Sequence, residues 1–204
     1  MSRLEMLEIQ PYVTTAEPAW DIARLFPDQG DWSEADYLAL DTNHLIEYSH
    51  GNIEVLPMPS DRHQAIVGSL FGSLSELARS VGGVNRVAPL RIRLWPGKIR
   101  EPDLLFLASA SDPRRQNQFW SGADLVVEVV SPDDPERDLM TKRREYAQAS
   151  IPEYWIVDPR TETILVLSLA GASYRERRYG RGEQALSVAF PALVVDVSAA
   201  LDAI

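Results

Sequence analysis

The chain has 204 residues, a formal net charge of −10 at pH 7 and no cysteine. Its length suits one domain with a sizeable core, and the absence of cysteine excludes disulfides, zinc sites built from cysteine, iron–sulfur clusters and a thiol nucleophile. No apolar stretch is long enough to cross a bilayer, and the acidic N-terminus lacks the pattern of a signal peptide. We therefore expect a cytoplasmic protein that does not associate with membranes.

Hydrophobic periodicity and turn residues predict a succession of helices and strands along the chain. Residues 1–30 are weakly patterned and are interpreted as an N-terminal arm, and residues 31–204 as a single α/β domain. In chain order, the first predicted elements are a short helix over 33–40, a hairpin over 44–55, and a helix over 61–80 that ends at Gly82-Gly83. A strand over 84–94 follows, and then strands over 101–107 and 124–130 that are joined by a long loop. The last elements are a helix introduced by Pro132 and Pro135 that reaches about residue 150, strands over 153–158 and 163–169, and a hairpin over 174–188.

In two of the predicted strands a carboxylate, Asp103 in the first and Glu128 in the second, lies inside a short apolar run. A buried charge is costly unless it is paired or binds a metal. If the strands pair antiparallel so that Leu107 faces Asp124, Asp103 faces Glu128. Two bare carboxylates at that distance repel each other, and a Mg²⁺ or Mn²⁺ ion between them removes the conflict. The spacing thus allows a divalent-metal site for cutting phosphodiesters.

Lys142 follows on the next predicted helix, where Leu139, Lys142, Tyr146 and Ala149 share the face expected to pack on the sheet. A lysine on a packing face has two explanations. Its stem carries the ammonium out to solvent, or its ammonium meets the Asp103 and Glu128 carboxylates. In the second case it is placed to orient an attacking water and to stabilise charge on the phosphate.

Several segments in order resemble the Uma2 family, which belongs to the PD-(D/E)XK nuclease superfamily. They are Pro102-Asp103, the LVVEVVSP run at 125–132, Asp138 with the KRREY run at 142–146, the IPEYWIVDP run at 151–159, and an upstream stretch with Glu47, Gly51 and His63. The resemblance covers roughly residues 32–197. It implies a restriction-endonuclease-like mixed β-sheet flanked by helices, with an additional N-terminal helix and hairpin and a C-terminal β-hairpin.

The resemblance also implies roles for individual residues. Asp103 matches the motif aspartate and Glu128 the motif glutamate, and together with the backbone carbonyl of Val129 they are expected to hold Mg²⁺ or Mn²⁺. The superfamily's usual lysine position is occupied by Val130, so Lys142 is expected to take the role of that lysine.

Two further residues enter through the same resemblance. Glu47 is interpreted either as a solvated hairpin residue or as a metal ligand or a support for one. His63 is expected to line the cleft, the alternative being a capping or surface histidine. Tyr146, Tyr154 and Trp155 are expected in the core rather than as platforms for bases.

The function implied is a metal-dependent endonuclease that acts on DNA, with a homodimer suggested by analogy to other nucleases of this fold. Two alternatives stay open: a catalytically weak or inactive module that binds nucleic acid or protein, and a metal-dependent hydrolase of another phosphate ester.

Charge distribution bears on where a nucleic acid would bind. Residues 1–60 contain two basic and eleven acidic residues, a net charge of −9, whereas residues 61–204 are almost neutral. We expect the acidic segment to avoid the nucleic acid except near Glu47. The strand with Arg91 and Arg93 and the helix with Arg143 and Arg144 are expected to flank the cleft.

Overall fold

The computed structural model describes residues 26–42 and 44–204, so most of the predicted N-terminal arm lies outside the described residues. The helices are α2 (Glu34–Leu38), α3 (Asp61–Val81), η1 (Arg137–Lys142), α4 (Arg143–Gln148) and α5 (Val197–Leu201). The strands are β1 (Ile46–Ser49), β2 (Asn52–Val55), β3 (Val84–Val87), β4 (Arg91–Trp95), β5 (Lys98–Arg100), β6 (Leu104–Leu107), β7 (Phe119–Trp120), β8 (Leu125–Val129), β9 (Glu153–Asp158), β10 (Thr163–Ala170), β11 (Ser173–Gly180), β12 (Gln184–Leu186) and β13 (Val194–Asp196). Across these residues, no helix is both long and apolar enough to cross a membrane.

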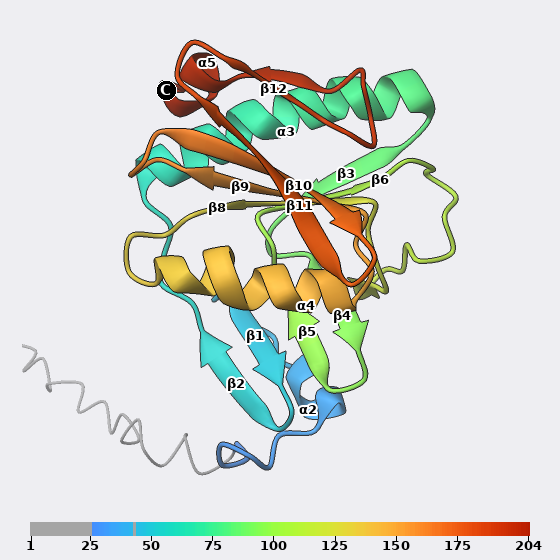
Figure 1. The fold of residues 1–204 in the computed structure, drawn as a ribbon. Coiled ribbons are helices and arrows are strands. Elements are labelled where there is room, and N and C mark those ends of the chain that lie inside the picture. Colours follow the sequence, from blue (N-terminus) through green and yellow to red (C-terminus); the bar gives the residue numbers. More distant parts are fainter. Residues whose placement is uncertain (1–25, 43) are drawn as a thin grey trace, which may run out of the picture.

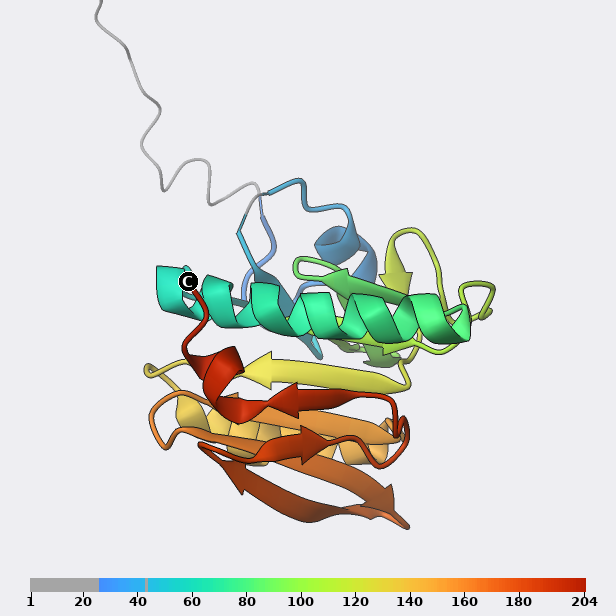
Figure 2. The same ribbon diagram turned by 90° about the horizontal axis from the view of Figure 1, so that it is seen from above.

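The centre of the molecule is a six-stranded mixed sheet in the order β11-β10-β9-β8-β6-β3 (Figure 1). Its one parallel pair is β8 with β9, and η1 and α4 form the crossover between these two strands. Helix α3 covers the other face, together with α5 and the β12-β13 pair (Figures 1 and 2). The mixed sheet flanked by helices that the sequence predicts is therefore confirmed.

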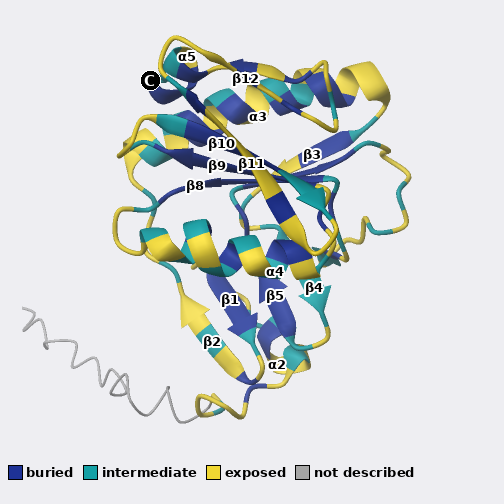
Figure 3. Ribbon diagram, in the orientation of Figure 1, coloured by how far each residue is buried: buried dark blue, intermediate teal, exposed yellow. Residues whose placement is uncertain are grey.

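A second sheet of five strands, in the order β2-β1-β5-β4-β7, lies beyond α4 (Figure 1). Helix α2 packs on it and buries Tyr37 against Ile46, Tyr48 and Ile99. The predicted short helix and hairpin near the N-terminus are thus confirmed. The strands at the centre of both sheets are the most completely buried parts of the chain (Figure 3).

Helix α3 begins and ends where its sequence signals indicate. The Ser60 side chain accepts a hydrogen bond from the backbone N–H of His63, which caps the first turn. At the other end Gly82 adopts φ +73°, a left-handed conformation that glycine enters at little cost. The start of α3 matters for the site because this cap fixes the position of His63.

The register of β6 against β8 is the one assumed from the sequence. Leu104 faces Val127 and Phe106 faces Leu125. Continuing this pairing by one residue places Asp103, just before β6, opposite Glu128. Side chains alternate across the sheet, so that Val127 and Val129 pack towards α3 whereas Glu128 points to the side of η1 and α4.

The strand predicted over 84–94 is wrong as a single element. Its first part is β3, at the edge of the six-stranded sheet, and its second part is β4, in the five-stranded sheet. Pro89 lies between them and has no N–H to donate to a ladder, so the chain turns there. Residues 84–94 thereby connect the two sheets.

Two other predicted elements differ from the structure. The helix after Pro135 is present, but its first six residues, η1, are π-helical. The hairpin predicted over 174–188 is wrong, because β11 pairs along its whole length with β10, and β12 pairs instead with β13. The tight turn at Gly171 directs β11 back onto β10. The C-terminal hairpin is formed by β12 and β13.

Candidate active site

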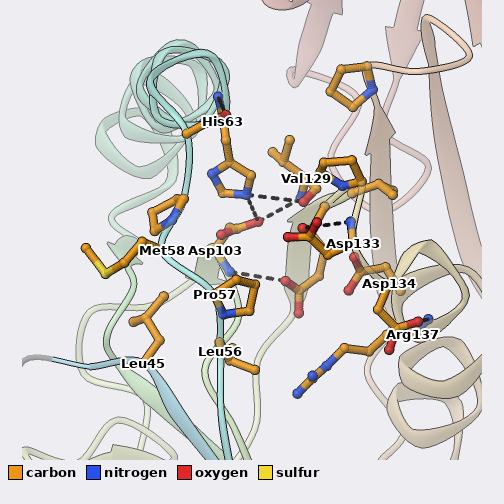
Figure 4. A pocket seen from close by; sticks show the side chains of 18 of the residues that line it. Leu45, Leu56, Pro57, Met58, His63, Asp103, Val129, Asp133, Asp134 and Arg137 are labelled. Carbon is orange, nitrogen blue, oxygen red and sulfur yellow. Dashed lines mark hydrogen bonds and ion pairs between the residues drawn. The ribbon is translucent and has the colours of Figure 1, made fainter.

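A pocket of about 440 Å³ opens where β6 begins and β8 ends (Figure 4). One side is the segment that leads into α3, and the other is the segment that leads from β8 into η1. Asp103, Glu128, Val129, His63 and Lys142 all line it. Five of the residues singled out from the sequence are therefore brought together in one cavity.

Asp103 is held by its neighbours on two sides. Its Oδ2 accepts a hydrogen bond from the backbone N–H of Val129 at 2.7 Å and lies 3.3 Å from His63 Nε2. The same Nε2 lies 3.2 Å from the carbonyl oxygen of Val129 (Figure 4). Both oxygens are acceptors, so Nε2 must carry the proton that they share. His63 therefore lines the pocket, as predicted, with its ring against both oxygens.

Glu128 is almost fully enclosed, and its two oxygens have different environments. Oε1 receives hydrogen bonds from Lys142 Nζ at 2.8 Å and from the Tyr146 hydroxyl at 2.7 Å. Oε2 has a single long contact, 3.4 Å from the backbone nitrogen of Asp103. Oε1 is consequently fixed by the helix, and Oε2 is the oxygen left to bind something else.

Lys142 reaches the carboxylates, so its ammonium is not carried out to solvent. Besides Glu128 it contacts Asp138 Oδ1 at 2.9 Å, four residues earlier on the same helix. The π-helical turn over Arg137–Lys142 thus directs both a cation and an acid into the site, and such turns are frequent where residues have functions. The sequence analysis assigned no role to Asp138, although its spacing of four from Lys142 was visible.

Glu47 is buried, which rules out the interpretation of this residue as a solvated part of the hairpin. Its carboxylate is held by the guanidinium groups of Arg100 and Arg137 and by the backbone N–H of Glu101. Lys142 Nζ is 3.9 Å away. Glu47 does not line the pocket. Its negative charge therefore helps to hold the side chains of Lys142 and Arg137 in place from outside the pocket.

Burial and neighbouring charges set the protonation of these groups. Burial is the main cause that raises the pKa of Glu128 above its usual value. The charge of Lys142 lowers this pKa, and the charges of Asp138 and Asp103 raise it. Burial alone would lower the pKa of Lys142, but Asp138, Glu128 and Glu47 together raise it. Burial likewise opposes the charged form of Glu47, yet Lys142, Arg100 and Arg137 bring its pKa down to about 2. Lys142 is consequently an ammonium at neutral pH.

The pKa of His63 is shifted by two opposed effects. Burial lowers it, whereas the hydrogen bond and the charge of Asp103 raise it by more. Its Nδ1 is buried and has no hydrogen-bond partner among the described residues. The His63 ring is therefore held by hydrogen bonds at Nε2 but not at Nδ1.

The donor atoms fit a hard divalent cation. Asp103 Oδ2 and the Val129 carbonyl converge on one point, now served by the N–H of His63, and Glu128 Oε2 is the least engaged oxygen nearby. Carboxylate and carbonyl oxygens are the ligands that Mg²⁺ and Mn²⁺ prefer. Within residues 26–42 and 44–204, however, no three acidic or histidine side chains stand in a ready-made metal cluster. Binding a cation would require His63 to adjust.

The basic residues at the pocket differ from those expected. Arg91 pairs with Glu101, Arg93 with Glu34, and Arg143 with Glu176, and none of these arginines lines the pocket. Its cations are Arg62, Arg137, Lys142 and Arg160. The expectation that residues 1–60 avoid the nucleic acid except near Glu47 stays a prediction. Leu45 and Glu54, which line the pocket, are neighbours of Glu47, and the 56–60 segment also lines it.

Comparisons with known proteins agree with this geometry. The Uma2 family model, described as "Putative restriction endonuclease", matches residues 34–198. A solved structure described as "a putative nuclease belonging to DUF820 from Anabaena variabilis ATCC 29413" is 18% identical, with a TM-score of 0.69, over 83% of this chain and 97% of that one. At this identity the likeness shows the fold, and it confirms the restriction-endonuclease-like architecture. A comparison with curated proteins gave no match.

Proposed function

Because the chain belongs to the Uma2 family, whose description is that of a nuclease, we propose that it is a Mg²⁺- or Mn²⁺-dependent endonuclease that hydrolyses phosphodiester bonds in DNA. One observation carries the proposal. Asp103, Glu128 and the Val129 carbonyl turn oxygens into the same pocket, and Lys142 is hydrogen bonded to one of the two carboxylates at 2.8 Å.

Asp103, the Val129 carbonyl and Oε2 of Glu128 are the proposed ligands. A bound divalent cation would lower the pKa of a water molecule and neutralise charge on the phosphate. Tyr146 and Lys142 hold Glu128 from the opposite side, which fixes its orientation without occupying Oε2. Fixing a ligand through its other oxygen is a common way of tuning a metal site.

Lys142 acts in this proposal as a hydrogen-bond donor. An ammonium has no lone pair, so it does not take a proton from water. It can orient the attacking water and stabilise negative charge that develops on the phosphate, and its own position is fixed by Asp138. Arg137 and Arg160 also line the pocket, but both are paired with carboxylates, whereas Arg62 lines it without an ion pair among the described residues and is the proposed contact for the phosphate backbone.

A second candidate is a module that binds nucleic acid without cutting it. The observation in its favour is that His63 already holds Asp103 and the Val129 carbonyl together, in a site with no ready-made cluster of metal-binding side chains among the described residues. Calorimetric titration with Mn²⁺ separates the two, since a non-catalytic module has no need to bind the ion at these oxygens.

We expect the wild-type protein to nick supercoiled plasmid in Mn²⁺ and Asp103→Asn to lose that activity, because the substitution removes a ligand charge. The matched control is Asp124→Asn, which lies at the other end of the same strand pair and contacts Arg114 instead. The control should nick normally. Equal nicking by wild type and Asp103→Asn would exclude the proposed active site.

A further inference from the structure

The pocket has two unlike sides (Figure 4). The side before α3, which we term the apolar wall, consists of Leu45, Leu56, Pro57, Met58 and Pro59. Met58 is 77% exposed, although it is a large apolar residue. An exposed apolar surface beside a charged site is typical of a place where a ligand packs.

The opposite side carries Asp133 and Asp134, both exposed, which we term the acidic rim, and it also contains Arg137 and Arg160, each paired with a carboxylate. The pocket lining as a whole contains seven acidic residues against four arginines and lysines. Duplex DNA carries one negative charge for every 1.7 Å or so of its axis, and a single strand carries half that density. The acidic rim therefore opposes a duplex more strongly than a single strand.

The carboxylates lie below these two sides. The Glu128 side chain is 4% exposed and that of Asp103 15%. A phosphate must enter the pocket to reach them, and a volume of about 440 Å³ is in the range of pockets that enclose one drug-sized molecule. A nucleotide in an unpaired strand can turn into such a space, whereas a paired one first has to leave the duplex.

Two buried polar atoms of pocket residues have no partner in the described part of the chain: His63 Nδ1 and Arg137 Nε. Buried polar groups are nearly always hydrogen bonded, so unpaired ones call for an explanation. Because both atoms are buried, a nucleotide would pair with them only after the His63 ring and the Arg137 side chain shift as it enters. The pocket thus presents an apolar side for a base and polar atoms for a phosphate and sugar.

We propose that the pocket receives an unpaired polynucleotide strand, either a single strand or an unpaired stretch within a duplex, and discriminates against intact duplex. This inference rests on the proposed function, because it takes the same pocket as the place of cleavage. It adds the class of substrate: a flexible strand with one accessible nucleotide.

The first test is binding of fluorescein-labelled DNA to the wild-type protein in EDTA, so that no cleavage can occur. The probes are a single-stranded 20-mer, the matched duplex, and that duplex with a three-nucleotide bulge. We expect the single strand and the bulged duplex to bind at least tenfold more tightly than the intact duplex. Equal or tighter binding of the intact duplex would overturn the proposal.

Cleavage of the same probes in Mn²⁺ separates this inference from the proposed function. A preference for unpaired probes in both binding and cleavage supports both. Faster cleavage of the intact duplex leaves the nuclease in place and overturns the inference. Tight binding of unpaired probes with no cleavage of any probe supports the inference about the pocket and removes the proposed function.

Substitutions on the two sides test the cause of the preference. Asp133→Asn with Asp134→Asn should tighten duplex binding more than single-strand binding, whereas the same charge change at the exposed Asp28 and Asp31 should leave the ratio unchanged. Met58→Ser should weaken single-strand binding several-fold. Its control is Met140→Ser, since Met140 is 57% exposed and lies outside the pocket. If substitutions on the acidic rim and on the apolar wall both leave the ratio of single-strand to duplex affinity unchanged, the proposal fails.

Discussion

Glu128 and Glu153 are two buried glutamates of the central sheet with opposite surroundings. Glu153 accepts hydrogen bonds from the Trp155 indole and from the backbone N–H groups of Val188 and Ala189. All three donors are uncharged N–H groups of the folded chain. Glu128 instead faces a lysine and a tyrosine on one oxygen and the pocket on the other. Glu153 therefore ties segments of the chain together, whereas Glu128 keeps one oxygen available for a ligand.

We expect Glu128→Gln to fold with little loss of stability, because its amide oxygen can still accept from Lys142 and Tyr146 and because burial, which raises the pKa of Glu128, already disfavours the charged carboxylate. Mn²⁺ affinity should fall at least tenfold, measured by calorimetry. Glu153→Gln is the contrast: its NH₂ group would face N–H donors, costing about 1–3 kcal/mol in the free energy of unfolding and leaving Mn²⁺ affinity unchanged. Unchanged affinity in Glu128→Gln would contradict the ligand assignment.

Among elements, the hairpin β1-β2 and the helix η1 are joined by charge. Glu47 on β1 pairs with Arg137 at the start of η1, and Arg137 also pairs with Glu54 on β2. Arg100 on β5 pairs with Glu47 from the neighbouring strand. The five-stranded sheet therefore fixes the helix that carries Lys142, and through it one side of the pocket.

Glu47→Gln should lower the free energy of unfolding by about 3–5 kcal/mol at pH 7, because it removes the fully buried counter-charge that Arg100 and Arg137 share. The Glu47 pKa is lowered to about 2, so its contribution is complete above the ordinary value of 4.5 and is lost as the pH falls from there towards 2. At pH 3.5 the difference between variant and wild type should shrink by about 1.4 kcal/mol. Urea unfolding at pH 7 and 3.5 measures it, and a difference independent of pH would refute this account.

The control for that experiment is Glu54→Gln. Glu54 shares Arg137 with Glu47, but its side chain is 58% exposed. Exposed ion pairs contribute about 0–1 kcal/mol, so this variant should resemble the wild type at both pH values.

The sequence predicted those parts of the fold and the site that depend on local periodicity. The β6-β8 register that was assumed from the two apolar runs is the one observed, and helical spacing placed Lys142 and Tyr146 on the face that packs on the sheet. Spacing alone left open whether the Lys142 ammonium meets the carboxylates or reaches solvent. With the β6-β8 register, the sequence spacing alone places Asp103 and Glu128 at the same end of the sheet.

Pairings between residues far apart in the chain could not be predicted in this way. The Arg137–Glu47 pair joins positions 90 residues apart, and no local pattern indicates which acid an arginine will meet. The same holds for Arg91, Arg93 and Arg143, whose partners remove them from the proposed substrate path. Two features had a local signal that the sequence interpretation overlooked: the interruption at Pro89, and the spacing of four that brings Asp138 to Lys142.

For the whole molecule, the proposed path of the nucleic acid follows the cations that remain at the pocket. Arg62 lines the pocket and forms no ion pair with another residue of 26–42 or 44–204. We expect Arg62→Ala to weaken binding of a single strand and to flatten the slope of log K against log[salt] by about 0.7, the value for one lost phosphate contact. Arg144→Ala, an exposed arginine outside the pocket, is the control. Equal slopes for the two variants would place the nucleic acid elsewhere.

The connection between β6 and β8 leaves the sheet at the end opposite Asp103 and Glu128. Its tip, with Gln116 and Asn117, is exposed. Because the chain contains no cysteine, a single Asn117→Cys substitution creates one thiol, which accepts one fluorophore at a known place. A second thiol at Met140, which is exposed and lies outside the pocket on the helix that carries Lys142, would hold a second dye near the pocket without altering the apolar wall. The molecule is thereby suited to single-molecule fluorescence, in which a strand arriving at the pocket changes the emission of one dye while the other serves as an undisturbed reference.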